Sequence, residues 1–396
     1  MKYAPILDRL AHLGSAKWEV HYAAQDKARS GLDVIDLTIG NPDVPAPDVL
    51  IETATSSMRA GRTQYSTGRG EASLRQALAE RYAARAQRPV DAGQVLCFPG
   101  TQTALYTVMM GLAGPGTEVL VGDPMYATYE GVVAASGAVV VPVPLRPENG
   151  FRISAGDLAD RITDRTRAIL LNTPHNPTGA VLTAADVAAI GAVAKAHDLW
   201  IVSDEVYEEL VFDGVPFVSP FDQADFADRT VVVSSISKSH AAPGFRSGWS
   251  VSSAEFADRL LPLSETMLFG NQPFIADMTA AAIARPSTVA AGMRDRFSAR
   301  ARYLADRMAQ ETALVVNRPE AGMFALIDVT ATGMNDRDYA FDLLGRSDVA
   351  VMPGTSFGPT LKGWVRLALT VDDARFRAAC DRIVAHAASL RQEVRA

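Results

Sequence analysis

Residues 231–249, VVVSSISKSHAAPGFRSGW, carry the pattern that decides how this chain is interpreted. The stretch starts with an apolar, β-branched run that does not alternate with polar residues. Such a run is typical of a strand that is covered on both faces, as in a parallel sheet. The run ends in serines and is followed by Lys238, one of only six lysines in the chain. A lysine at the end of a buried strand is costly unless its ammonium group is paired or used covalently.

Lys238 is therefore a candidate for the covalent attachment of a cofactor. A Schiff base with an aldehyde cofactor would remove the cost of the buried charge and would supply chemistry. Ser235, Ser237 and Arg246 lie close by in the sequence, and their hydroxyl and guanidinium groups suit a phosphate. The alternative is a surface turn in which the lysine has no special role.

Short apolar runs and longer helical patterns alternate on either side of this stretch. This alternation predicts an α/β fold: a large domain with a mostly parallel seven-stranded sheet covered by helices. We expect the strands at residues 95–98, 118–121, 138–143, 168–171, 200–203, 230–234 and 248–251.

After about residue 285 the pattern changes to that of a smaller α+β domain. A charged helical stretch, residues 293–310, leads into short strands near residues 323–329 and 364–369, and a last helix covers residues 372–391. The sequence thus predicts three parts: an N-terminal segment, residues 1–45, which joins the small domain; a large cofactor-binding domain, residues 46–285; and a small C-terminal domain, residues 286–396.

Composition and charge exclude several classes of protein. The chain has 396 residues, with 38 Lys plus Arg against 45 Asp plus Glu, and a formal net charge of −7. An acidic chain without a basic block is a poor candidate for binding nucleic acid or an anionic membrane surface. Two distant cysteines, Cys97 and Cys380, make neither a disulfide framework nor a metal site. Because no secretory signal and no long apolar run are visible, we expect a cytoplasmic enzyme without a metal.

A second candidate group is the carboxylate of Asp204, in WIVSDEVYEEL. An acid at the end of an apolar strand suits a partner for a pyridinium nitrogen, because its charge keeps the ring protonated as an electron sink. Tyr207 follows three residues later and is placed to hydrogen-bond a phenolic oxygen of the same ring. An ordinary acidic loop after a strand is the alternative.

Two further motifs place polar groups at strand ends or helix starts. LNTPHNPTG, residues 171–179, brings Asn172 and Asn176 to the carboxyl edge of the sheet, where open α/β folds bind ligands. In PGTQTALYTVMMGL, residues 99–112, Thr101 and Gln102 open a helix whose free N–H groups suit a phosphate. Tyr126, in DPMYATYE, is a candidate for stacking on a planar ring. A plain turn, a plain helix start and simple packing are the respective alternatives.

The order of these motifs along the chain is that of a known family. A helix-start glycine, an aromatic residue, N-x-x-x-N-P-T-G, S-D-E-x-Y, S-x-S-K and a downstream R-L occur in succession. In this succession the chain resembles the class I/II aminotransferases, which belong to the fold-type I enzymes that depend on pyridoxal 5′-phosphate (PLP). The resemblance runs from TIGNPDVPAPD, residues 38–48, to WVRLALT, residues 364–370.

The resemblance implies how the cofactor is held. It makes Lys238 the Schiff-base lysine and proton shuttle, and Asp204 the partner of the pyridine nitrogen. One departure from the family pattern is Pro243 before Gly244, where a threonine is common, and this puts one hydroxyl contact in doubt. The other implied cofactor contacts are Tyr207 and Asn176 at the ring oxygen, Tyr126 on the ring, and Thr101, Gln102, Ser235, Ser237 and Arg246 around the phosphate.

The resemblance also implies the partners of the site, an L-amino acid and a 2-oxo acid. Arg366 would bind the substrate α-carboxylate through two parallel hydrogen bonds, with Gly40 and Asn176 beside it. Tyr65, in TQYSTGRGEASLRQAL, would reach the cofactor phosphate of a neighbouring subunit, so a homodimer with shared active sites is expected.

The amino-acid sequences of several segments resemble those of the arginine–pyruvate transaminase subgroup, including KWEVHY, PENGFR and MLFGNQPF. Glu19 would then be a conceivable partner for a basic substrate side chain, although a solvated helix residue is the favoured interpretation. Aspartate aminotransferases and PLP-dependent β-lyases on the same fold remain alternatives. A PLP-binding transcription regulator would need an added basic DNA-binding domain, and a nucleotide-dependent dehydrogenase would need a different glycine motif.

Overall fold

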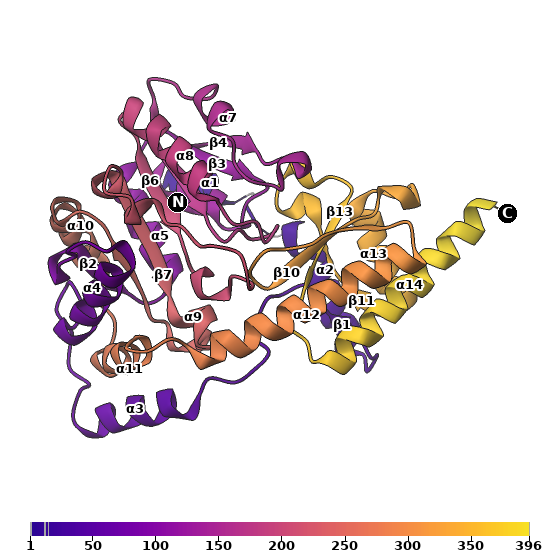
Figure 1. The fold of residues 1–396 in the computed structure, drawn as a ribbon, viewed down its shortest axis with the longest axis horizontal. Coiled ribbons are helices and arrows are strands. Elements are labelled where there is room, and N and C mark those ends of the chain that lie inside the picture. Colours follow the sequence, from indigo (N-terminus) through magenta and orange to yellow (C-terminus); the bar gives the residue numbers. More distant parts are fainter. Residues whose placement is uncertain (1, 12, 15, 396) are drawn as a thin grey trace.

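A seven-stranded sheet forms the centre of the larger part of the molecule (Figure 1). The computed structural model describes residues 2–11, 13–14 and 16–395. The strands of this sheet are β2 (Val95–Phe98), β3 (Glu118–Asp123), β4 (Val139–Pro144), β5 (Thr166–Asn172), β6 (Trp200–Asp204), β7 (Thr230–Ser235) and β8 (Gly248–Val251). Their order is β2-β8-β7-β6-β5-β3-β4, and β8 runs in the direction opposite to that of the other strands. The prediction of a mostly parallel seven-stranded sheet is therefore confirmed.

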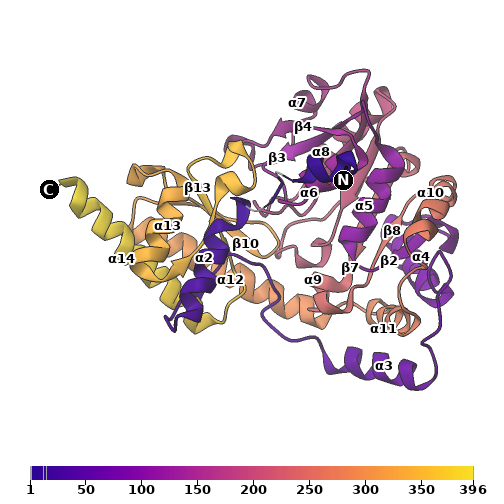
Figure 2. The same ribbon diagram turned by 180° about the vertical axis from the view of Figure 1, so that it is seen from behind.

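Helices cover both faces of this sheet (Figures 1 and 2). The helices of this part are α3 (Asp48–Arg59), α4 (Ala72–Ala86), α5 (Thr101–Leu112), α6 (Tyr129–Ser136), α7 (Ala155–Ala159), α8 (Ala184–Ala196), α9 (Ile236–Ser239), α10 (Ala254–Met267) and α11 (Pro273–Ile283). In β5, Leu170 packs with the core beside α5, α6 and α10, whereas Leu171 packs with the core beside α8. Because both faces are covered, the strands need no polar alternation.

A second, four-stranded sheet lies at the other end of the molecule, with the C-terminal helices beside it (Figures 1 and 2). Its strands, in the antiparallel order β12-β13-β10-β9, are β9 (Val315–Asn317), β10 (Phe324–Asp328), β12 (Met352–Pro353) and β13 (Trp364–Ala368). A two-stranded parallel pair joins β1 (Ile35–Asp36) to β11 (Val349–Ala350). The surrounding helices are α2 (Glu19–Arg29), α12 (Thr288–Glu311), α13 (Asp336–Ser347) and α14 (Asp373–Arg395), while α1 (Pro5–Leu10) packs on α6.

We propose a division of the chain at about residues 45 and 285. The strands of the large sheet all lie between these positions, and the four-stranded sheet follows the second of them. The N-terminal segment joins the small domain because β1 pairs with β11. No helix in the described ranges is long and apolar enough to cross a membrane.

Element boundaries differ from the sequence-based expectations by a few residues. The helix expected at residues 293–310 begins earlier, at Thr288, where the side chain of Ser287 caps it by accepting from the Ala290 backbone. The strands β1, β11 and β12 were not expected. Each has only two residues. Such a short strand is defined by its pairing with a distant segment, and no local sequence pattern predicts it.

Candidate active site

A cavity of about 300 Å³ opens at the carboxyl ends of the parallel strands, between the large sheet and the four-stranded sheet. Every predicted site residue except Tyr65 lines it: Gly40, Thr101, Gln102, Tyr126, Asn176, Asp204, Tyr207, Ser235, Ser237, Lys238, Arg246 and Arg366. Open α/β sheets bind ligands at this edge because the loops that follow parallel strands converge there.

Lys238 lies in α9, directly after β7, and its ammonium group is largely enclosed. Its Nζ donates to the Gly40 carbonyl oxygen at 2.8 Å, and in the described part of the chain it pairs with no carboxylate. Burial, together with the positive charges of Arg366 and Arg246, lowers the pKa of Lys238 to about 8. A lysine amine with this pKa is partly neutral near pH 7, which is the state in which it acts as a nucleophile or a base.

Asp204 ends β6 and is only 4% exposed. The Tyr129 hydroxyl donates to its Oδ2 at 2.8 Å, and the Val206 backbone N–H donates to its Oδ1 at 3.2 Å. Burial raises the pKa of Asp204 to about 6, while these two donors oppose the rise. Across the described residues no cation pairs with this carboxylate, so a cationic group placed in the cavity would find a buried counter-charge.

Tyr129 is a site residue that the sequence interpretation missed. Its ring lies edge-on to that of Tyr126, with centroids 5.6 Å apart. Both tyrosines occur in MYATYE, and the spacing of three places them on one side of a helix start. The spacing between the two tyrosines is therefore the sequence signal that points to Tyr129 as well as to Tyr126.

The start of α5 and the turn after α9 form a cradle with unused donors. Gly100 has φ +93°, and a Cβ there would collide with the guanidinium of Arg246. Thr101 Oγ1 is buried and has no hydrogen-bond partner in the described structure. Arg246 donates to the carbonyl oxygens of Pro243 and Pro99, at 2.8 and 3.4 Å, and to no described carboxylate. A helix start, an unpaired guanidinium and free hydroxyls together suit a phosphate group.

Arg366 is a further cation of the cavity that pairs with no carboxylate of the described residues. It comes from β13, is 2% exposed, and lies between the rings of Phe324 and Phe357, whose centroids are 3.9 and 4.3 Å from its Cζ. Nη1 donates to Asn176 Oδ1 at 3.1 Å and Nη2 to the Thr38 carbonyl oxygen at 2.5 Å, but buried Nε finds no acceptor among the described residues. Burial lowers the pKa of Arg366. A buried guanidinium in this state calls for an anionic ligand.

The asparagines of the 171–179 turn hold this side of the cavity together. Asn172 Nδ2 donates to the Asp204 carbonyl oxygen at 3.0 Å, and its Oδ1 accepts from the Asn176 backbone N–H at 2.8 Å. Tyr207 and Asn176 both line the cavity, and burial raises the pKa of the Tyr207 phenol. The structure therefore links the S-D-E-x-Y and N-P-T-G motifs through the side chain of Asn172.

Two residues considered in the sequence do not reach the cavity within this chain. Tyr65 is 91% exposed and packs edge-on against Phe269, with ring centroids 5.8 Å apart. Glu19 accepts from Arg337 Nη2 at 2.7 Å on the surface, while its neighbour Trp18 lines the cavity. Within this chain, Trp18 therefore lines the cavity and Glu19 does not.

The fold and this combination of groups define the class of the protein. The sequence model of the family "Aminotransferase class I and II" matches residues 32–383. The chain therefore belongs to this family and is an aminotransferase. Members of the family generally depend on PLP and act on amino acids and 2-oxo acids.

Individual relatives extend over nearly the whole chain. The arginine–pyruvate transaminase AruH of Pseudomonas aeruginosa is 43% identical over 390 residues, which are 98% of this chain and 99% of that protein. The aspartate aminotransferase of Musicola paradisiaca is 30% identical over 98% of this chain and 99% of its own. The aspartate aminotransferase of Thermus thermophilus, solved with maleate, superposes with a TM-score of 0.91 at 29% identity, covering 98% and 100% of the two chains.

Proposed function

We propose that this aminotransferase uses PLP at Lys238 to move the amino group of an L-amino acid to a 2-oxo acid. One observation carries the proposal: among the described residues, a single cavity holds a lysine without a carboxylate partner, a buried carboxylate without a cation and a buried arginine with an unused donor. Each of these groups is costly to bury alone. Each cost is offset if the cavity takes an aldehyde, a protonated pyridine ring and a substrate carboxylate.

The donor set fits PLP group by group. Lys238 Nζ would hold the aldehyde carbon, Asp204 the ring nitrogen, and Tyr207 with Asn176 the ring oxygen. The cradle of Thr101, Gln102, Ser235, Ser237 and Arg246 would hold the phosphate, and Tyr126 would pack on the ring. When bound, PLP supplies an electron sink that makes the substrate α-carbon acidic.

The chain's own residues then perform three tasks. Lys238 Nζ, when neutral, would accept the proton from the substrate α-carbon and would act as the proton carrier of the site. Asp204 stays ionised and holds a proton on the ring nitrogen, while Tyr129 keeps the carboxylate oriented. Arg366, clamped between Phe324 and Phe357, fixes the substrate carboxylate and thereby the direction of the bond to be broken.

The pKa of Lys238 gives a pH-dependent prediction. Because burial brings it down to about 8, the amine loses its proton as the pH rises through that value, and only the neutral amine attacks an aldehyde. The rate of covalent PLP attachment to the cofactor-free protein should therefore rise up to about pH 8 and level off above about pH 9. Absorbance after rapid mixing measures it. A rate that keeps rising about tenfold per pH unit beyond pH 9 would mean that Lys238 keeps an ordinary lysine pKa.

Arg366→Lys should weaken substrate binding while PLP stays attached. Lysine keeps the charge but loses the planar pair of donors, and it cannot stack in the same way between two rings. Charge-assisted hydrogen bonds contribute roughly 1.5–3 kcal/mol, so kcat/KM should fall about tenfold to hundredfold. Arg337→Lys on the surface serves as the control, because Arg337 pairs with Glu19 outside the cavity. If the two variants have equal kcat/KM values, Arg366 has no role in substrate binding.

For the substrate, we propose arginine as amino donor and pyruvate as acceptor. The 43% identity to an arginine–pyruvate transaminase over the full length supports this choice. The cavity supports it too, because Trp18 and Asn41 line it and offer an aromatic ring and an amide to a guanidinium. The cations that line it in the described structure, Lys238, Arg246 and Arg366, all have other tasks in this proposal.

Aspartate is the second candidate donor, favoured by the aspartate aminotransferases that match the chain in sequence and structure. Its side-chain carboxylate would need a further cation, which a neighbouring subunit would have to provide. A panel of amino donors against pyruvate, oxaloacetate and 2-oxoglutarate separates the two candidates. Arginine with pyruvate should give the highest kcat/KM, and a preference for aspartate with 2-oxoglutarate would reject arginine as the substrate.

We also propose a homodimer in the cytoplasm, with active sites shared between subunits. Tyr65 projects into solvent beside Phe269, and α3 exposes the apolar side chains of Val49, Ile51 and Met58. Neighbouring exposed apolar residues are typical of a protein interface, and there Tyr65 would reach the partner's phosphate cradle. Cys97 and Cys380 are both free and buried, which suits a reducing compartment.

A further inference from the structure

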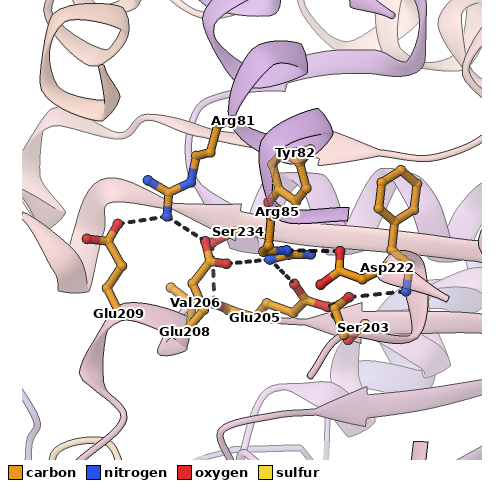
Figure 3. Close-up of polar contacts among 12 residues, drawn as sticks. Arg81, Tyr82, Arg85, Ser203, Glu205, Val206, Glu208, Glu209, Asp222 and Ser234 are labelled. Atoms are coloured by element: carbon orange, nitrogen blue, oxygen red, sulfur yellow. Dashed lines mark hydrogen bonds and ion pairs between the residues drawn. The ribbon is translucent and has the colours of Figure 1, made fainter. Parts of the chain in front are cut away.

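A network of buried and half-buried charged side chains lies next to the end of β6 (Figure 3). Its members do not line the cavity. Arg81 and Arg85 reach from α4 toward four carboxylates of the segments that follow β6. We call these residues the Glu205 network: Arg81, Arg85, Glu205, Glu208, Glu209 and Asp222. Nothing in the proposed transamination uses these groups directly.

Glu205 is the most enclosed member of the network, with no exposed surface. Its Oε1 accepts from the hydroxyls of Ser203 and Ser219, at 2.9 and 2.5 Å, and its Oε2 accepts from Arg85 Nη1 at 2.9 Å. Burial raises the pKa of Glu205, and the Arg85 guanidinium opposes that rise. Burying a carboxylate this deeply is costly, and the hydrogen bonds and the counter-charge of Arg85 offset that cost.

Arg85 connects Glu205 to the rest of the fold. Its Nη1 also contacts Glu208 Oε2 at 2.5 Å, and its Nε donates to Asp222 Oδ1 at 3.0 Å. The guanidinium lies over the ring of Tyr82, 4.7 Å from the centroid. One side chain of α4 thus ties together the end of β6, the turn that follows it and the segment at Asp222 (Figure 3).

Glu205 and Asp204 are neighbours that point to opposite faces of the sheet. Side chains alternate along a strand, so Ser203 and Glu205 share the network side while Asp204 lines the cavity. Asp204 Oδ1 is held by the Val206 N–H, which belongs to the residue just after Glu205. The Glu205 N–H in turn donates to the Val233 carbonyl oxygen at 3.0 Å, extending the β6–β7 pairing by one residue.

We infer that Glu205 is a positioning residue for the reaction: its carboxylate, clamped by Arg85, Ser203 and Ser219, fixes the backbone from Ser203 to Val206 and thereby aims Asp204 into the cavity. This inference rests on the proposed function, because it gives Asp204 its task at the cofactor ring. In the described structure, the Asp204 carboxylate accepts hydrogen bonds from Tyr129 and from the Val206 N–H on the cavity side. The other restraint on the orientation of the Asp204 carboxylate acts through the backbone, from the face of the sheet on which Glu205 lies.

Glu205→Gln tests the inference, because it keeps the size of the side chain and removes the charge that Arg85 binds. The matched control is Asp222→Asn, which takes a carboxylate from the same guanidinium without touching the Asp204 backbone. In the cofactor-free protein, hydrogen–deuterium exchange of the peptide covering residues 203–208 should rise in Glu205→Gln and stay unchanged in the control. In the PLP-loaded protein, the single-turnover rate should fall roughly tenfold to hundredfold in Glu205→Gln, with PLP still bound, because small displacements of a reacting group cost that much. The control should remain within about threefold of the wild type.

Ser219→Ala is a milder variant for the case that Glu205→Gln does not fold, since it removes one donor to Glu205 Oε1. In Ser219→Ala, hydrogen–deuterium exchange should rise and the single-turnover rate should fall, each by a smaller factor than in Glu205→Gln. Wild-type exchange and wild-type rate in a folded Glu205 or Ser219 variant would overturn the inference, and so would equal losses in Asp222→Asn. Asp204→Asn measured in parallel keeps the two proposals apart. A slow Asp204→Asn beside an unaffected Glu205→Gln rejects the positioning role alone, whereas a fast Asp204→Asn rejects the proposed task of Asp204.

Discussion

Lys238→Ala is expected to abolish transamination and to remove the imine absorption of the purified protein. The structure offers no substitute: Lys238 is the lysine that lines the cavity in the described residues, and its Nζ contacts the loop at Gly40. Loss of a nucleophile that also moves the proton should lower turnover by several orders of magnitude. PLP should still associate without a covalent bond, because the phosphate cradle is intact. Lys195→Ala, which changes an exposed side chain of α8, is the control and should behave like the wild type.

The same variant also tests the shared active site. In a mixed dimer with Tyr65→Ala, one site combines both defects and the other has Lys238 and Tyr65 intact, provided that Tyr65 acts across the interface. Activity should therefore reappear when two impaired preparations exchange subunits. Absence of recovery after proven exchange would place Tyr65 outside the partner's site.

Asp204→Asn should keep PLP bound but slow proton abstraction by roughly hundredfold or more. The amide of asparagine carries no charge, so it does not hold the ring nitrogen protonated and the electron sink weakens. Single-turnover absorbance with an amino donor measures the step separately from product release. Asp123→Asn is a matched control, since Asp123 is another buried acid at the end of a strand of the same sheet and does not line the cavity. If both variants lose activity equally, burial of an acid at this edge matters more than its contact with the ring.

The sequence predicted the parts of the site whose residues are costly to bury. Lys238, Asp204 and Arg366 each follow or lie within an apolar run, and in a buried strand such groups indicate a function. The large sheet was predictable for a related reason, because strands covered on both faces appear as continuous apolar runs such as Val231–Val233.

The remaining parts depend on contacts between distant segments. Phe324 and Phe357 sandwich Arg366, but each is an ordinary apolar residue in the sequence. Glu205 is hidden in the same way, because the S-D-E-x-Y pattern draws attention to Asp204 and gives no sign of Arg85 from α4, 120 residues earlier. The role of Tyr65 depends on a second subunit, which no single-chain pattern specifies.

The most direct test of the central claim follows the nitrogen atom. The PLP-loaded protein is mixed with arginine labelled at its α-nitrogen and with pyruvate, and the alanine formed is analysed by mass spectrometry. The proposed function predicts that the label appears in alanine with the wild-type protein and not with Lys238→Ala. Labelled alanine from the Lys238→Ala protein, or none from a PLP-loaded wild type with any amino donor and 2-oxo acid acceptor of the panel, would contradict the proposal that this cavity transfers amino groups.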